Sequence, residues 1–170
     1  MTAGVPFIDT TSGAYKYQGT SGTPAVLALA DGTVHLVPLI HPFTGSTGFQ
    51  SVAVTTFQGI GTISFDPSAL FTTNGKVTRA LKFEAILEAT PTVTIEVRLY
   101  NLTAGSVVSG STLSSSVNTP TYVSATLTAG SELPNSNQLY EVQLRISSPA
   151  SPIGSDRAIC KLAQLVSTWS

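Results

Sequence analysis

The chain has 170 residues, of which 42% are hydrophobic and only 10% are charged, and its formal net charge is -1. This length supports one well-buried core rather than two. A charge so close to zero gives no long-range attraction to phosphate backbones or anionic lipid headgroups, so we expect neither nucleic-acid nor membrane binding. The polar surface consists mostly of Ser and Thr, which protect the edges of β-sheets poorly, and this favours a role inside an assembly.

The N-terminal segment, residues 1–50, is predicted to form an arm. Its first 24 residues are rich in Gly, Thr and Ser and bury too little apolar surface to fold alone. Three aromatic residues, Phe7, Tyr15 and Tyr17, are candidate contacts with a partner protein. A disordered tail is the alternative interpretation. The segment begins without the basic and apolar stretches of a secretory signal, so we expect synthesis in a cytoplasm.

Two turn signals lie before the densest strand pattern. Asp31-Gly32 separates two short apolar runs and predicts a hairpin within residues 26–40. Asp66 followed by Pro67 predicts a single helical turn that ends at Phe71.

The main domain, residues 51–170, contains two strongly alternating segments. In the first, residues 77–89, most apolar side chains share one face, while Lys82, Glu84 and Glu88 share the other; Arg79 breaks this pattern near the start of the segment. The second runs from Val93 to Tyr100. If the two segments form a hairpin, the register that places Glu84 opposite Arg98 avoids facing like charges and is preferred. Alternatively, Pro91 marks a corner where the chain crosses from one sheet to another.

Further strands are predicted at residues 121–128, 139–146 and 158–166, the last with a less regular pattern. No segment of useful length has helical periodicity. Several strands at about ten-residue spacing, separated by Gly, Pro and Asn turns, predict an all-β antiparallel sandwich. The core cysteines and core tryptophan of immunoglobulin domains are missing, which favours a jelly roll with an extended N-terminal arm.

The residues that carry catalysis or metal binding are scarce. His35 and His41 are the only histidine bases, no nucleophile elbow accompanies them, and the lone Cys160 has apolar neighbours and is predicted to be a buried hydrophobe. One cysteine and two histidines do not suffice for a typical zinc site, and the aspartates are scattered singly. We therefore assign no catalytic residue, no metal and no cofactor, and expect no enzymatic activity.

Carbohydrate binding is the main alternative function. Sugar sites on β-sandwiches use exposed aromatic side chains together with a few amides and carboxylates. Tyr100 and Tyr122 are the candidate glycan contacts if their rings face outward. The alternative, structural interpretation is that these tyrosines pack against the protein and keep only the hydroxyl end in water.

Three segments carry a resemblance to known proteins. The run Leu99-Tyr100-Asn101-Leu102-Thr103-Ala104-Gly105 is followed by a Ser/Thr-rich stretch, by Ser124-Ala125-Thr126-Leu127, and by Leu139-Tyr140-Glu141-Val142-Gln143-Leu144-Arg145. In low charge, Ser/Thr-rich turns and paired strands, about residues 77–166 resemble small jelly-roll virion proteins of tailed bacteriophages.

The resemblance implies a structural role. Domains of this kind decorate capsids, form fibres or bind host glycans, and they have no fixed catalytic set to transfer. It implies a capsid decoration protein that binds the major capsid protein or another virion protein through the arm. It also implies a homo-oligomer, a trimer by analogy, that is made in the host cytoplasm and located in the virion. The alternative within this group is a carbohydrate-binding module of a tail fibre or adhesin.

Overall fold

A computed structural model describes residues 6–9, 14–18, 24–26, 34–40, 50–66, 72–73, 76–91, 93–128, 130–148 and 156–169. All regular secondary structure in these ranges is β-strand. The strands are β1 (Pro6–Asp9), β2 (Ala14–Gln18), β3 (Pro24–Val26), β4 (Val34–Ile40), β5 (Gln50–Val52), β6 (Gln58–Phe65), β7 (Thr72–Thr73), β8 (Lys76–Ala89), β9 (Thr94–Asn101), β10 (Ser106–Val107), β11 (Leu113–Ser115), β12 (Thr121–Leu127), β13 (Gln138–Ser148) and β14 (Ala158–Trp169). No helix in the described ranges is long and apolar enough to cross a membrane.

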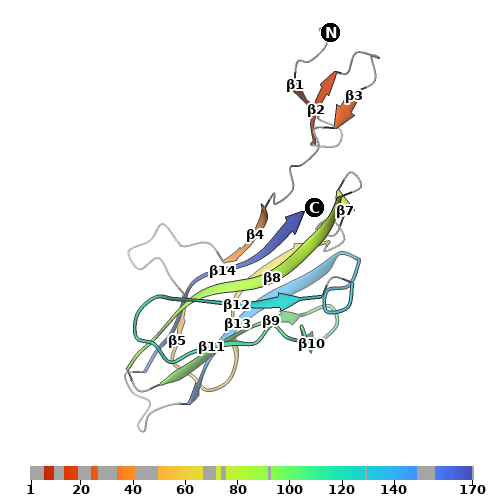
Figure 1. Ribbon diagram of the computed structural model, residues 1–170. Helices are drawn as coiled ribbons and strands as arrows, with labels where there is room; N and C mark the ends of the chain where they lie inside the picture. Colours follow the sequence, from red (N-terminus) through yellow and green to blue (C-terminus); the bar gives the residue numbers. More distant parts are fainter. Residues whose placement is uncertain are drawn as a thin grey trace.

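Two antiparallel sheets form the main body (Figure 1). The first, which we call the β8 sheet, has the order β12-β8-β14-β4, with β5 also paired to β14 and β7 to β8. The second, the β9 sheet, has the order β10-β9-β13-β6, with β11 also paired to β9. Along the chain, β4, β6, β8 and β9 alternate between the two sheets, and so do β12, β13 and β14. This order is that of a jelly roll, so the predicted fold class is confirmed.

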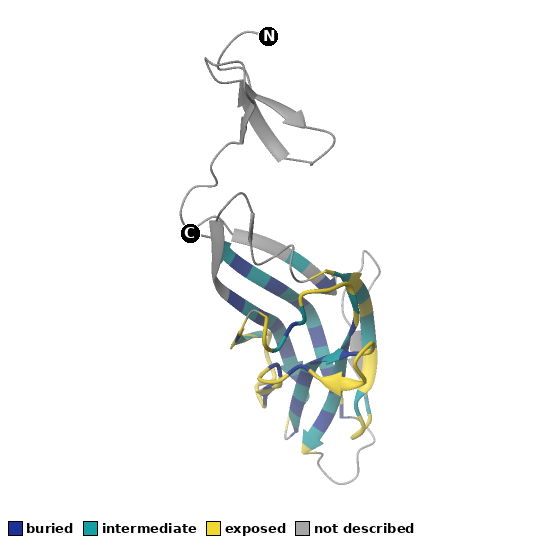
Figure 2. Ribbon diagram, turned by 90° about the vertical axis from the view of Figure 1, so that its right-hand side faces the viewer, coloured by how far each residue is buried: buried dark blue, intermediate teal, exposed yellow. Residues whose placement is uncertain are grey.

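The core lies between the two sheets and follows from the period-two pattern. Figure 2 shows this pattern as alternating bands of buried and half-buried residues along the strands. Side chains at every second position point into the core, while their neighbours point to the outer faces. The buried positions that the sequence predicts in β8, β9 and β13, and at Val93 just before β9, are confirmed for Leu81, Phe83, Ala85, Leu87, Ala89, Val93, Ile95, Val97, Leu99, Tyr140, Val142, Leu144 and Ile146.

The predicted hairpin between the two alternating segments is wrong. Strands β8 and β9 lie in different sheets, so Glu84 is opposite Ser124 and Gln164, while Arg98 is opposite Gln143. The alternative is correct, because the chain crosses between the layers in the segment that contains Pro91. A proline at this point cannot continue the hydrogen-bonded ladder of β8.

The predicted hairpin within residues 26–40 lies largely outside the described residues, which include only Val26 of its first apolar run. Strand β3 pairs with β2 in a separate sheet of order β1-β2-β3, whereas β4 pairs with β14 in the β8 sheet. The Asp31-Gly32 turn itself lies outside the described residues, as do the residues of the predicted helical turn after Asp66. Strand β4 lies within the segment that the sequence assigned to the arm, and it forms one edge of the sandwich.

Candidate functional site

Charge is distributed unusually across the two sheets. Every charged side chain of a sandwich strand belongs to one of the four central strands β8, β9, β13 and β14, namely Lys76, Arg79, Lys82, Glu84, Glu88, Glu96, Arg98, Glu141, Arg145 and Lys161. The strands at the margins, β4, β6, β10, β11 and β12, contain no Asp, Glu, Lys or Arg. Soluble β-proteins usually place charge on such strands to prevent association with another chain. These margins are therefore suited to contact other proteins.

Strand β12 forms one of these margins, beside β8. Its seven residues pair with β8 from Thr121 opposite Leu87 to Leu127 opposite Leu81, without a register shift. Tyr122, Ser124 and Thr126 are exposed on the outer face. Within the described part of the chain, no strand pairs with the other side of β12. Its outward backbone groups are available to a further strand.

A hydrogen-bonded trio lies beside this margin, on the outer face of the β8 sheet. The Tyr122 hydroxyl donates to Glu84 Oε1 over 2.6 Å, and Gln164 Nε2 donates to Glu84 Oε2 over 3.1 Å. The bond to Glu84 raises the pKa of Tyr122, because it favours the neutral phenol. Glu84 is thus held from both neighbouring strands, and Tyr122, which donates to it, has 58% of its residue surface exposed.

The outer face of the β9 sheet carries a second cluster, formed by arginines and aromatic rings. The Arg98 guanidinium carbon lies 3.6 Å from the centre of the Phe57 ring, and that of Arg145 lies 4.3 Å from the same ring. Arg98 Nε donates to Gln143 Oε1 over 2.8 Å, and Arg145 donates to Glu96 through Nε and Nη2. Burial lowers the pKa of Arg98, and the nearby positive charge of Arg145 lowers it further.

The arginine cluster continues toward Tyr100 and Glu141. Tyr100 and Glu141 are directly opposite each other on β9 and β13, and the Tyr100 ring centre is 5.6 Å from the Arg98 guanidinium. Gln143 Nε2 donates to Glu141 Oε2 over 2.6 Å, so the amide links Glu141 to Arg98. A Cβ at Gly59 would meet the Glu141 carboxylate, so a larger residue at this position would displace the end of the Glu141 side chain. The face presents donors, acceptors and a ring, which together suit a polyhydroxylated ligand.

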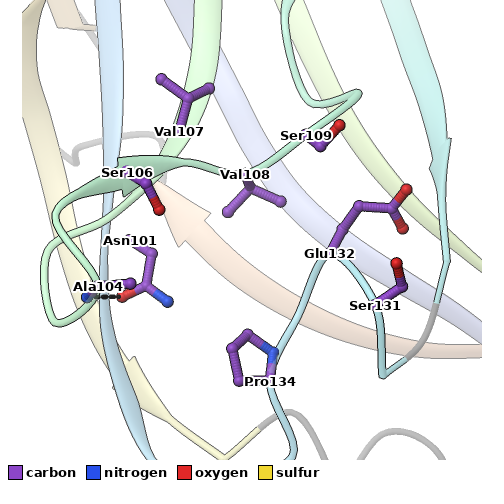
Figure 3. A pocket seen from close by; sticks show the side chains of 9 residues that line it. All are labelled: Asn101, Ala104, Ser106, Val107, Val108, Ser109, Ser131, Glu132 and Pro134. Carbon is purple, nitrogen blue, oxygen red and sulfur yellow. Dashed lines mark hydrogen bonds between the residues drawn. The ribbon is translucent and has the colours of Figure 1, made fainter.

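A cavity of about 280 Å³ lies between the loop after β9 and the loop before β13 (Figure 3). Its wall includes Asn101, Ser106, Ser109, Ser131 and Glu132. Asn101 Oδ1 accepts the Ala104 N–H over 2.9 Å and its Nδ2 donates to Gln138, so this amide orders the loop. The Thr128 N–H donates to the Glu132 carboxylate. The wall offers one carboxylate and several hydroxyls, but it brings no histidine or cysteine beside a serine.

The structure separates the two candidate glycan contacts. Tyr100 lies on the outer face of the β9 sheet and Tyr122 on the outer face of the β8 sheet, so they do not form one site. The candidate partner contacts lie on neighbouring strands, Phe7 in β1 and both Tyr15 and Tyr17 in β2. The arginine cluster was not predicted from the sequence. The only signal was charge at alternating positions of the segments that form β9 and β13, and this signal does not show that the two segments are neighbours.

The residues considered for chemistry are also placed apart. His35 lies in β4 opposite Ser167, and His41 lies outside the described residues. Cys160 is buried in the core, which confirms its prediction as a small hydrophobe, and burial raises the pKa of its thiol to about 12. In the ranges that the structure covers, no group of three His, Cys, Asp or Glu residues is arranged to hold a metal ion.

Comparisons with known proteins give only distant structural likenesses. No protein family model and no curated protein matches the sequence. Among solved structures, VP2 of an infectious bursal disease virus subviral particle matches 86% of this chain at 11% identity and a TM-score of 0.42. The T13 particle of the same virus matches 91% at 13% identity, also with a TM-score of 0.42. The carbohydrate-binding module CBM36, solved with calcium and xylotriose, matches 71% at 16% identity with a TM-score of 0.25.

These matches differ in how much of the other chain they cover. The chain spans only 34% and 37% of the two viral chains, and 99% of the carbohydrate-binding module. Likenesses of this size carry no information about partners or ligands. The matched solved structures include viral particle proteins and a carbohydrate-binding module.

Proposed function

We propose that the chain is a virion structural protein of the capsid decoration type, which associates with protein neighbours in a bacteriophage particle. The observation that supports this is the absence of charge from the margins of both sheets, together with its concentration on the central strands. In a protein that stays monomeric, charged residues on the edge strands prevent association with other chains. A protein that is consumed by assembly does not need this protection.

The arm is proposed to contact the shell. Phe7, Tyr15 and Tyr17 lie on two paired strands, with Phe7 opposite Lys16 and Tyr15 opposite Ile8. Aromatic anchors of this kind supply large apolar area and a polar end, which suits a protein interface. The proposed partner is the major capsid protein or another virion protein. The resemblance to phage proteins implies three copies per unit, whereas the margin at β12 supports two, as argued below.

Binding to the particle should depend little on salt. The margin strands are uncharged, and the arm strands β1 and β2 carry only Asp9 and Lys16. Contacts formed by these strands and by aromatic rings gain mainly from apolar burial and backbone hydrogen bonds, which mobile ions do not screen. Charged interfaces instead weaken as ionic strength rises. We expect the fraction of chain bound to particles to change by less than about threefold between 50 mM and 1 M NaCl, where the Debye length falls from above 10 Å to about 3 Å.

The experiment is co-sedimentation of the full-length chain with purified particles that lack it. A variant with Phe7→Ala, Tyr15→Ala and Tyr17→Ala should lose particle binding at every salt concentration. Tyr100→Ala, an aromatic change on the sandwich, is the matched control and should bind normally. A decrease of two orders of magnitude at high salt, or normal binding by the triple variant, would contradict the proposal. Absence of the chain from purified virions would contradict it altogether.

A second candidate function is carbohydrate binding, as in a tail-fibre module. The supporting observation is the outer face of the β9 sheet, where Tyr100, Arg98, Gln143 and Glu141 form a connected row of ring, donors and acceptors. On a glycan array, the intact chain should bind defined sugars and Tyr100→Ala should abolish that binding. Tyr122→Ala on the opposite sheet is the control. An array without any signal, or equal loss in both variants, would count against this site.

A further inference from the structure

The four margins of the sandwich differ in how well they are protected. Strand β4 contains Pro38, which cannot donate a backbone hydrogen bond, and its pairing with β14 has a register shift. Strand β6 contains Gly59 and Gly61 and has a register shift against β13. Strands β10 and β11 have only two and three residues. Proline, irregular register and short length are the recognised protections of an edge that carries no charge.

Strand β12 has none of these protections. Its sequence, Thr121 to Leu127, contains no proline, glycine or charge, and its seven pairs with β8 run without a shift. Four of its seven residues are Thr, Tyr or Val, the types that favour strands. A regular, uncharged and unpaired edge of this length is the feature that promotes addition of another strand.

We propose that β12 pairs antiparallel with β12 of a second copy of this chain, so that the two β8 sheets become one sheet across a two-fold axis. The inference rests on the proposed assembly function and names one of its partners. In such a pair each residue meets the symmetry copy of a residue in the same strand. A charged residue near the axis would face itself, and β12 contains no charged residue.

The register of full overlap gives favourable side-chain pairs. Ser124 is the middle residue of β12 and would face its own copy at the axis. Tyr122 would then lie opposite Thr126 of the second copy on the outer face, an aromatic ring against a β-branched side chain. On the inner face, Val123 would lie opposite Ala125. All of these side chains suit a continuous sheet surface.

Repulsion between the nearest half-buried charges does not prevent the pairing of the two β12 strands. Glu84 lies on β8 opposite Ser124, and it is bonded to Tyr122 and Gln164 of its own chain. The two Glu84 residues would be separated by three strand spacings, about 14 Å. This distance exceeds the Debye length of about 8 Å at physiological salt, so their repulsion is largely screened.

Cysteine cross-linking tests the partner and the register together. Ser124→Cys should form an intermolecular disulfide under mild oxidation, because this residue faces its own copy. Tyr122→Cys and Thr126→Cys should each cross-link poorly alone but efficiently when the two variants are mixed. Thr62→Cys, an exposed position on the margin strand β6, is the matched control. The native Cys160 is buried and should not contribute.

A charge substitution and a mass measurement complete the test. Light scattering should show a species of twice the 17.6 kDa chain mass. Ser124→Glu should raise the dissociation constant of the pair about fivefold or more, because two carboxylates face each other at the axis. Thr62→Glu is matched to it, since Thr62 lies opposite Glu141 as Ser124 lies opposite Glu84. Circular dichroism confirms that each variant is folded.

The outcomes distinguish this inference from the proposed function. A monomer or a trimer in solution, or cross-linking of Ser124→Cys no faster than that of Thr62→Cys, would overturn the β12 pair. If particles still capture the chain in that case, the assembly function stands and only the partner of β12 is wrong. If Ser124→Glu is monomeric but binds particles normally, both the pair and a separate contact with the shell are supported.

Discussion

Ser111 provides a sharp test of how the loop after β9 is attached to the sandwich. Its side chain is fully buried, and its Oγ accepts the Leu99 N–H over 3.0 Å and donates to the Val108 carbonyl over 2.7 Å. Backbone bonds from Val108 to Leu99 and from Ser111 to Val108 reinforce the same turn. The hydroxyl therefore serves the loop and β9 at once. The perturbation we consider is Ser111→Ala.

The magnitude follows from the bonds that the substitution removes. Alanine leaves the Leu99 N–H without its acceptor in a site that excludes water, which costs about 1–3 kcal/mol. The Val108 carbonyl loses less, because it still accepts the Ser111 N–H. We expect the free energy of unfolding to fall by about 2 kcal/mol, which for a chain of this length lowers Tm by roughly 4–8 °C.

The assay is urea denaturation at neutral pH, with the midpoint and slope fitted for each variant. Ser109→Ala is the matched control, because Ser109 is an exposed serine of the same turn. It should change stability by less than about 0.5 kcal/mol. If Ser111→Ala and Ser109→Ala were equally stable, the buried hydroxyl would not hold the loop, and the reasoning would be refuted.

Three further predictions concern the core. Phe83→Ala should cost about 3–5 kcal/mol in denaturant titrations, since the ring is fully buried in β8, and a loss below 1 kcal/mol would contradict its place in the core. Burial raises the Cys160 thiol pKa to about 12, so a thiol reagent at pH 8 should label it only after unfolding, and rapid labelling of the native chain would be inconsistent with this. Burial also raises the Tyr140 pKa to about 12, so the folded state favours the neutral phenol. The contribution of Tyr140 to stability should therefore be constant below pH 10 and fall between about pH 10 and 12. The substitution Tyr140→Phe should remove part of that fall. An identical alkaline profile for Tyr140→Phe would exclude Tyr140 as a cause.

The sequence was sufficient to predict on which face of its strand each side chain lies, but not which strands pair with each other. Alternation in β8, β9 and β13 assigns each side chain to the inside or the outside, because this depends only on the period of the strand. Which strand lies beside β8 depends on how the chain returns through the second layer. The paired charges of Glu84 and Arg98 therefore suggested a hairpin that the structure replaces with a crossing between sheets.

Local irregularities explain other differences. The predicted strand at residues 158–166 had an unclear pattern because β14 has a register shift between Cys160 and Leu162. The stretch after β9 is rich in Ser and Thr, yet Val108 and Leu113 are buried there. Their burial depends on Ser111 and other polar groups finding partners, which a hydrophobicity pattern does not reveal.

The candidate site could be predicted only in part. The low proportion of charged residues is visible in the composition. It indicated strand edges without protective charge, and therefore an assembly role. The distribution of that charge over central and marginal strands required the strand order, since margins are defined by topology and not by sequence position. The arginine cluster required three-dimensional proximity, because Phe57 and Arg98 are distant in the chain.

The irregularity in β14 limits which deletions the strand tolerates. Lys161 and Leu162 are consecutive and both half-buried, whereas Ala158, Cys160, Ala163 and Leu165 are buried. Loss of Lys161 alone would restore strict alternation and keep each of these four residues inward, at the cost of its ion pair with Glu88. Loss of Gln164 would instead turn every later side chain to the opposite face. Loss of Leu162 instead of Lys161 would give the same alternation, so natural length variation in this strand should be confined to these two positions.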